Sequence, residues 1–71
     1  MKKLLKLYSL NSDMQYFEMI VESVINGQRT QAKEQFKAMP KDAQKAFLRA
    51  IFGEWDSGLS DKDAHMFINC I

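Results

Sequence analysis

Lysine and arginine recur at every fourth position through the middle of the chain, at Arg29, Lys33, Lys37, Lys41, Lys45 and Arg49. Residues four apart lie on the same face of an α-helix, so each helix in this stretch would carry one basic stripe. Clustered Lys and Arg side chains displace counterions from a nucleic-acid backbone, and the stripe therefore predicts contacts with phosphate groups or with an acidic partner. The alternative interpretation is an ordinary solvated helix face, because Glu34 and Asp42 dilute the positive charge.

His65 and Cys70 are of residue types that bind metals or act in nucleophilic catalysis. They lie five residues apart rather than the four that would align two ligands on a helix, and Cys70 is the one cysteine of the chain. Asp56, Asp61 and Asp63 lack the alternating oxygen ligands of a calcium loop, and Phe67 stands where the bidentate Glu would be needed. We therefore expect no metal, no other cofactor and no enzymatic activity.

Three large side chains are candidates for contact with a protein partner. Tyr16 and Met19 fall outside the main apolar stripe of their helix, and Trp55 stands at a predicted helix end between two acidic residues. For Trp55 the alternative is a place at the edge of the core. The surplus apolar surface favours a non-enzymatic protein-interaction or regulatory module, which docks on a partner protein or on a second copy as a homodimer. The alternative is a nucleic-acid-associated protein that uses the basic stripe over positions 29–49.

One long helix is predicted over residues 12–26. Ser12 and Gln15 have the spacing of a capping box, and Gly27 follows where helices often close in a left-handed conformation. Phe17 and Val21, with apolar neighbours at steps of three and four, give the segment the period of an amphipathic helix.

Further helices are predicted at about residues 30–39, 41–55 and 60–70. Thr30 and Ser60 are the expected N-terminal caps of the first and the last of these, and Pro40 is expected to open the middle one. Their inward residues are expected to be Ala32, Phe36, Met39, Ala43, Phe47, Ala50, Ile51, Ala64, Phe67, Ile68 and Ile71. Residues 1–10 are basic and fit both a helix and a strand, so the sequence predicts no conformation for them.

These elements predict an all-α fold, a small bundle of three to four short helices in one domain over residues 1–71, with Phe17, Val21, Phe47, Ile51 and Phe67 at its centre. The chain is 46% hydrophobic, which is enough apolar bulk to fold, but 71 residues bury a limited core. No stretch is long and apolar enough to span a membrane. Lys6 interrupts the apolar start, so we expect no secretory signal and a cytoplasmic location.

The tract from Tyr16 to Met39 resembles short helical proteins that are often encoded by phages and other mobile elements. The resemblance suggests a genetic context and carries no functional residue over to this chain. It leaves both interpretations of the function open.

Overall fold

The described part of the chain folds into helices connected by short turns. The computed structural model describes residues 1–70, except for the side chain of Glu54. Its elements are α1 (Lys2–Leu7), α2 (Asp13–Ile25), α3 (Arg29–Ala38), α4 (Lys41–Arg49), the π-helical turn η1 (Ala50–Glu54) and α5 (Asp61–Ile68). The predicted all-α class is confirmed over these residues. The predicted number of three to four helices is too low, because residues 2–7, for which the sequence predicts no conformation, form α1.

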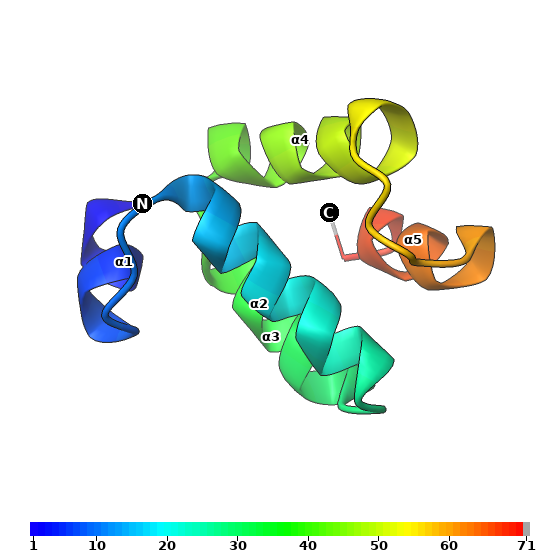
Figure 1. Cartoon of the computed structure of the whole chain (residues 1–71), viewed down its shortest axis with the longest axis horizontal. Coiled ribbons are helices and arrows are strands. Elements are labelled where there is room, and N and C mark those ends of the chain that lie inside the picture. Colours follow the sequence, from blue (N-terminus) through cyan, green and yellow to red (C-terminus); the bar gives the residue numbers. More distant parts are fainter. Residues whose placement is uncertain (71) are drawn as a thin grey trace.

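α2 and α3 form an antiparallel pair that lies side by side along its length (Figure 1). α4 starts at one end of this pair and runs away from it at an angle, and α5 lies below the far end of α4, where it contacts both α3 and α4. α1 stands at the opposite side of the molecule from α5 (Figure 1). The fold measures 30 × 22 × 21 Å along its principal axes. This arrangement brings the C-terminal helix against the first half of the basic stripe, on α3.

The ends of α2 follow the sequence prediction closely. Ser12 Oγ accepts a hydrogen bond from the backbone N–H of Gln15 at 3.3 Å. Gln15 Oε1 reaches back to the backbone N–H of Asn11 at 2.6 Å, one residue further than in a standard capping box. At the other end, Gly27 has a φ of 83°, a left-handed conformation that glycine adopts without strain. Both signals lie within a few residues of the ends that they fix.

The N-terminus of α3 differs from the prediction. The cap expected at Thr30 is wrong, because the helix begins at Arg29, after Gln28, and has no side-chain cap bond. The backbone N–H of Gln28 already donates to Ser23 O at 2.8 Å, which closes the turn from α2, so the chain enters the next helix directly. Pro40 likewise precedes α4 as its cap residue instead of being its first helical residue.

The helix predicted over residues 41–55 is interrupted after Arg49. The next five residues form η1, in which the backbone N–H of Trp55 donates to Ala50 O at 2.8 Å. Such a π-turn widens the helix and changes the directions of the side chains within it. Ile51, expected at the centre of the core, is only partly buried, and Phe52 is 44% exposed.

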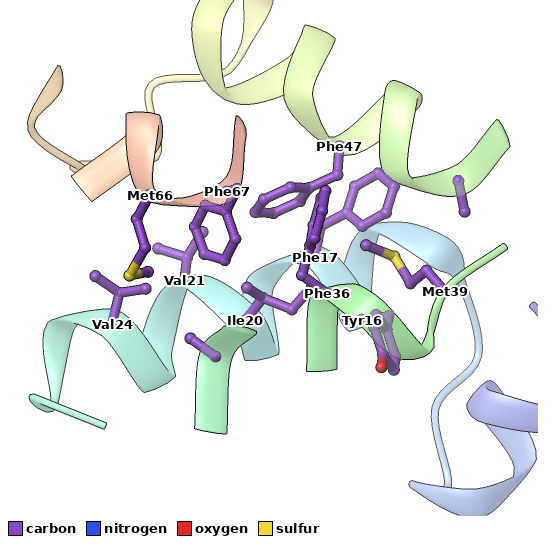
Figure 2. Close-up of a cluster of buried hydrophobic side chains, with 12 residues drawn as sticks. Tyr16, Phe17, Ile20, Val21, Val24, Phe36, Met39, Phe47, Met66 and Phe67 are labelled. Atoms are coloured by element: carbon purple, nitrogen blue, oxygen red, sulfur yellow. The ribbon is translucent and has the colours of Figure 1, made fainter. Parts of the chain in front are cut away.

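A cluster of phenylalanine rings joins four helices (Figure 2). The ring of Phe47 on α4 lies 5.3 Å from Phe17 of α2, 5.8 Å from Phe36 of α3 and 5.1 Å from Phe67 of α5, measured between centroids. Rings at such distances and at tilted or edge-on angles attract one another beyond the burial of their area. Phe36 and Phe67 are also 5.2 Å apart. The predicted meeting of Phe17, Val21, Phe47 and Phe67 inside the fold is confirmed, and it sets α5 against α3.

The buried face of α5 is rotated from the predicted one. Phe67 is buried as expected, but Ile68 is 44% exposed. Met66, which is only 7% exposed, is buried instead of Ile68. Met66 joins the same buried cluster as Val24 of α2, so the helix turns this side toward α2 and α3 (Figure 2). Ile71, also expected inside, lies outside the described residues.

α1 packs at the edge of the fold. It contains no fully buried residue, and Leu7 is 72% exposed, whereas Met1, Leu4 and Leu5 pack partly against the core. Within the part of the chain that the structure describes, there is no helix with the length and apolar character that crossing a membrane requires.

Candidate anion-binding groove

The basic stripe of the sequence is divided between two helices. Its members are Arg29, Lys33 and Lys37 on α3 and Lys41, Lys45 and Arg49 on α4, and all six are exposed. The α3 half lines a depression that is shared with α5, and the rings of Phe36 and Phe67 hold these two helices in contact.

An open depression of about 510 Å³ lies between α3 and α5. It is lined by Arg29, Lys33 and Lys37 from α3 and by Lys62, His65, Met66, Asn69 and Cys70 from α5 and the residues after it. We call this depression, with these eight residues, the α3–α5 groove. Positions 62, 65, 66 and 69 have the spacing of one helical face, so two helical faces meet across the groove. Among the described residues that line it, none is acidic.

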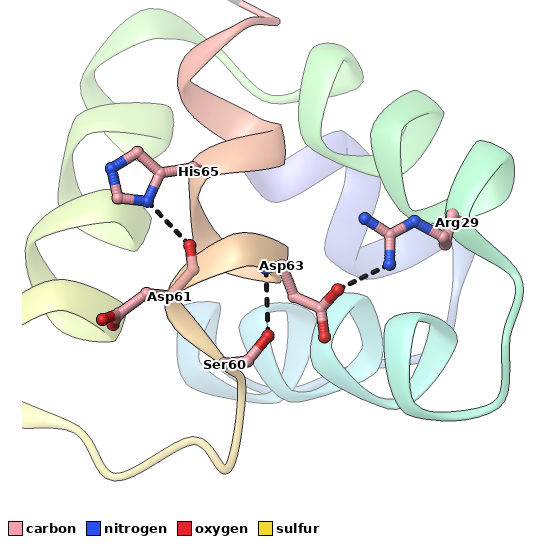
Figure 3. A network of polar contacts seen from close by, with 5 residues as sticks. All are labelled: Arg29, Ser60, Asp61, Asp63 and His65. Atoms are coloured by element: carbon pink, nitrogen blue, oxygen red, sulfur yellow. Dashed lines mark hydrogen bonds and ion pairs between the residues drawn. The ribbon is translucent and has the colours of Figure 1, made fainter.

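One cation of the groove is paired with a carboxylate at its border. Arg29 Nη1 lies 2.5 Å from Asp63 Oδ1, although the two residues are 34 positions apart in the sequence (Figure 3). Their side chains are 47% and 27% exposed, so water screens the pair and its contribution to stability is about 0–1 kcal/mol. Ser60 Oγ accepts a hydrogen bond from the backbone N–H of Asp63 at 3.2 Å, as the sequence predicts for a cap. This bond fixes the turn that carries Asp63.

Three lysines give the groove its positive charge. Lys33, Lys37 and Lys62 have no ion-pair partner among the side chains that the structure describes. A lysine ammonium is a compact point charge on a flexible stem, which suits a phosphate group whose position varies along a chain. Two acidic residues of α2, Glu18 and Glu22, line a different depression. The net charge of +1 therefore conceals a basic groove and an acidic face of α2.

His65 is held at the α5 side of the groove by two contacts. Its Nδ1 lies 2.7 Å from the backbone oxygen of Asp61 (Figure 3) and is the donor, because a carbonyl oxygen only accepts. Its ring meets the ring of Phe52 edge-on, with centroids 5.4 Å apart and planes at 84°. In the neutral ring with its proton on Nδ1, Nε2 has no hydrogen to donate to an anion. In that form, His65 offers the groove an aromatic surface.

The α4 half of the stripe does not join the groove. Lys41, Lys45 and Arg49 are exposed, but they are not among its lining residues. Within α4 they lie on the side away from Ala43 and Phe47, which face the core. The structure thus does not bring all six predicted phosphate contacts to one site, and the α4 half has the placement of a solvated helix face.

The side chains expected to contact a protein partner lie in the core or at its edge. Tyr16 is 0% exposed and its hydroxyl donates to the backbone oxygen of Gln35 at 2.7 Å, so the expectation that it is spare surface is wrong. The physical reason is that α3 and the end of α1 close over it, with the ring of Tyr8 edge-on at 5.8 Å. Met19 and Trp55 are partly buried and pack against the core.

Sequence reasoning missed the α5 side of the groove. Lys62 and Asn69 have the helical spacing that would mark a polar face, but nothing local indicates that this face meets α3. His65 is considered in the sequence only together with Cys70, as a possible metal ligand or nucleophilic partner. Its placement at the groove follows from the packing of Phe67 on Phe36, two residues that are far apart in the sequence.

Comparisons with protein-family models, with curated proteins and with solved structures find no match to this chain. The groove is therefore interpreted from its own residues.

Proposed function

We propose that this chain is a non-enzymatic, nucleic-acid-associated protein whose α3–α5 groove contacts the phosphate backbone. The observation that carries the proposal is the meeting of Lys33 and Lys37 with Lys62 around one open depression that has no acidic residue among its described lining. Lysine clusters of this kind bind phosphates because they release the counterions condensed on a nucleic acid. An open groove also suits a polymer that passes through it.

The other groups of the groove support binding better than catalysis. The thiol of Cys70 donates to the backbone oxygen of Met66 at 3.5 Å, and His65 Nδ1 is engaged by the backbone of Asp61. A nucleophilic pair needs its base within hydrogen-bond reach of the nucleophile and oriented by a third group. The contacts of these two side chains are instead local bonds to their own helix.

Salt dependence tests the proposal quantitatively. Three lysines of the groove have no ion-pair partner among the described side chains. The logarithm of the association constant is therefore expected to fall against the logarithm of the salt concentration with a slope of about −2 to −3. The measurement is fluorescence anisotropy of labelled oligonucleotides, begun at low ionic strength where phosphate contacts are strongest. An absence of binding to both DNA and RNA under these conditions would overturn the proposal.

A matched pair of double variants locates the contact. Lys33→Gln/Lys37→Gln and Lys41→Gln/Lys45→Gln remove the same charge from two exposed positions four apart, one pair on the groove and one on α4. The α3 variant is expected to weaken binding and to reduce the slope by about 1.4–1.8, whereas the α4 variant leaves both nearly unchanged. Equal effects of the two variants would mean that overall charge, and not the groove, governs binding.

A protein partner, or a second copy in a homodimer, is the second candidate. The enclosure of Tyr16 removes the main reason for it, and what favours it now is the exposure of Leu7 (72%) and Ile25 (64%). Sedimentation equilibrium distinguishes the candidates: a dimer that an Ile25→Ser variant dissociates would support an interaction module.

The sequence leads us to expect a cytoplasmic location and a phage or mobile-element context. A protein that binds nucleic acid is compatible with both expectations.

A further inference from the structure

An exposed aromatic ring contacts one of the residues that line the α3–α5 groove. Phe52 is 44% exposed, and its ring contacts that of His65, which lines the groove. The edge-on geometry braces the two rings against each other, while the exposure of Phe52 leaves part of its surface open to a ligand. His65 thus connects the ring of Phe52, which is not itself among the lining residues, to the groove whose cations lie on α3 and α5.

The backbone that carries Phe52 is itself unusual. Phe52 is the central residue of η1, where the helix departs from α geometry and the N–H of Trp55 bonds to Ala50 O. π-turns within helices are rare, and they occur frequently at functional sites. This observation is independent of the charge of the groove and points to the same place.

We infer that the groove takes a single-stranded nucleic acid, with its phosphates along Lys33, Lys37 and Lys62 and one base stacked on Phe52. The inference rests on the proposed function and adds to it the form of nucleic acid that binds. Lysine grooves combined with aromatic platforms bind single strands because every unpaired base offers a flat face to a ring. In a duplex the faces of the bases are covered by their neighbours, so no base is free to stack on Phe52.

Four probes of equal length separate stacking from charge: an oligo-dT strand, an oligo-rU strand, an abasic strand that keeps the phosphates, and a duplex. Oligo-dT is expected to bind at least about fivefold more tightly than the abasic strand, which corresponds to one stacked base. Oligo-dT is also expected to bind more tightly than the duplex. Comparison of the affinities for oligo-rU and oligo-dT shows whether the groove prefers single-stranded RNA or single-stranded DNA.

Substitutions at Phe52 test the platform directly. Phe52→Leu keeps an apolar side chain without a ring and is expected to abolish the preference for oligo-dT over the abasic strand, whereas Phe52→Tyr is expected to keep it. Ile68→Ala is the control, because Ile68 is equally exposed at 44% and lies on α5, outside the groove lining. Circular dichroism of each variant establishes that the helices are intact.

The outcomes distinguish the inference from the proposed function. The inference is overturned if the abasic strand binds as tightly as oligo-dT, or if the duplex binds most tightly. The proposed function still stands in either case, provided that Lys33→Gln/Lys37→Gln loses binding. If none of the four probes binds at low ionic strength and a poly-glutamate peptide does, both are overturned. Loss of the base preference in Phe52→Leu with unchanged binding of the abasic strand supports both.

Discussion

The guanidinium of Arg29 lies 2.5 Å from the carboxylate of Asp63 and joins the first residue of α3 to the first turn of α5. The pair borders the α3–α5 groove and cancels one of its charges. Because both side chains are partly exposed, the ion pair contributes little to stability. Its larger effect is to lower the positive electrostatic potential of the groove, to which an anion would bind.

Asp63→Asn is expected to strengthen oligonucleotide binding. The substitution frees Arg29 to contact a phosphate, so the slope of binding against salt should steepen by about 0.7–0.9. The free energy of unfolding should fall by no more than about 1–2 kcal/mol, from the lost ion pair and the lost charge at the start of α5. Fluorescence anisotropy across a salt series measures the slope. Asp61→Asn is the control, since it removes a charge from the same turn without an ion pair to Arg29; an equal change in slope would assign the effect to net charge alone.

The N-terminal caps provide a test of stability. Ser12→Ala and Ser60→Ala each remove an oxygen that accepts a backbone N–H, so each is expected to lower the free energy of unfolding by about 1 kcal/mol. Thr30→Ala is expected to change it by no more than a few tenths of a kcal/mol, because Thr30 lies within α3 and caps nothing. Urea denaturation of the three variants measures the differences. A cost for Thr30→Ala as large as that of the serine variants would contradict the helix start at Arg29.

The parts of the fold that the sequence predicts correctly depend on residues close together in the chain. Ser12 and Gln15 mark the start of α2, Gly27 marks its end, and Ser60 marks the start of α5, each through bonds that span a few positions. The apolar period of α2 is equally local. For the same reason the π-turn at Ala50–Glu54 is missed, because its apolar residues have the spacing of an uninterrupted helix.

The candidate site depends on contacts between residues that are distant in the sequence. For this reason the sequence predicts the α3 side of the groove and not its α5 side. The stripe on α3 is predicted, but its meeting with Lys62 requires the packing of Phe36 on Phe67. The burial of Tyr16 is missed because it depends on Tyr8, within a segment of ten residues whose pattern fits both helix and strand. A helical pattern predicts which side of a helix is apolar, and it does not predict which neighbour covers it.

Truncation of two phenylalanines that are close in sequence should destabilise the fold to very different extents. Phe47 is 0% exposed and contacts three other rings, so Phe47→Ala is expected to cost about 3–5 kcal/mol, much of the stability of a small domain. Phe52 is 44% exposed, and Phe52→Ala should cost about 1 kcal/mol or less. Thermal unfolding followed by circular dichroism compares them. Similar costs would mean that Phe52 belongs to the core and is not available to a ligand.

The buried phenol of Tyr16 makes the stability of the fold depend on pH in the alkaline range. Burial, with a smaller effect of the nearby Tyr8, raises the pKa of Tyr16 to about 12, whereas in the unfolded chain it is about 10. Tyr16 therefore keeps its proton to a higher pH in the folded state than in the unfolded state. The resulting stability is complete below pH 10 and is lost as the pH rises toward 12, by up to about 3 kcal/mol.

Tyr16→Phe isolates this effect, because both proteins share every other titrating group. Below pH 10 the variant should be less stable by about 1 kcal/mol, since it lacks the hydrogen bond to Gln35 O. As the pH rises the wild type loses the stability of its neutral phenol and the variant does not, so the two are expected to become equal near pH 11. Denaturant unfolding at several pH values gives the comparison, with Tyr8→Phe, at a 42% exposed position, as the control that keeps most of the pH dependence, because burial is the larger cause of the raised pKa of Tyr16. Parallel curves for wild type and Tyr16→Phe would show that Tyr16 ionises as readily in the fold as in the unfolded chain, and the enclosure of its hydroxyl would then be wrong.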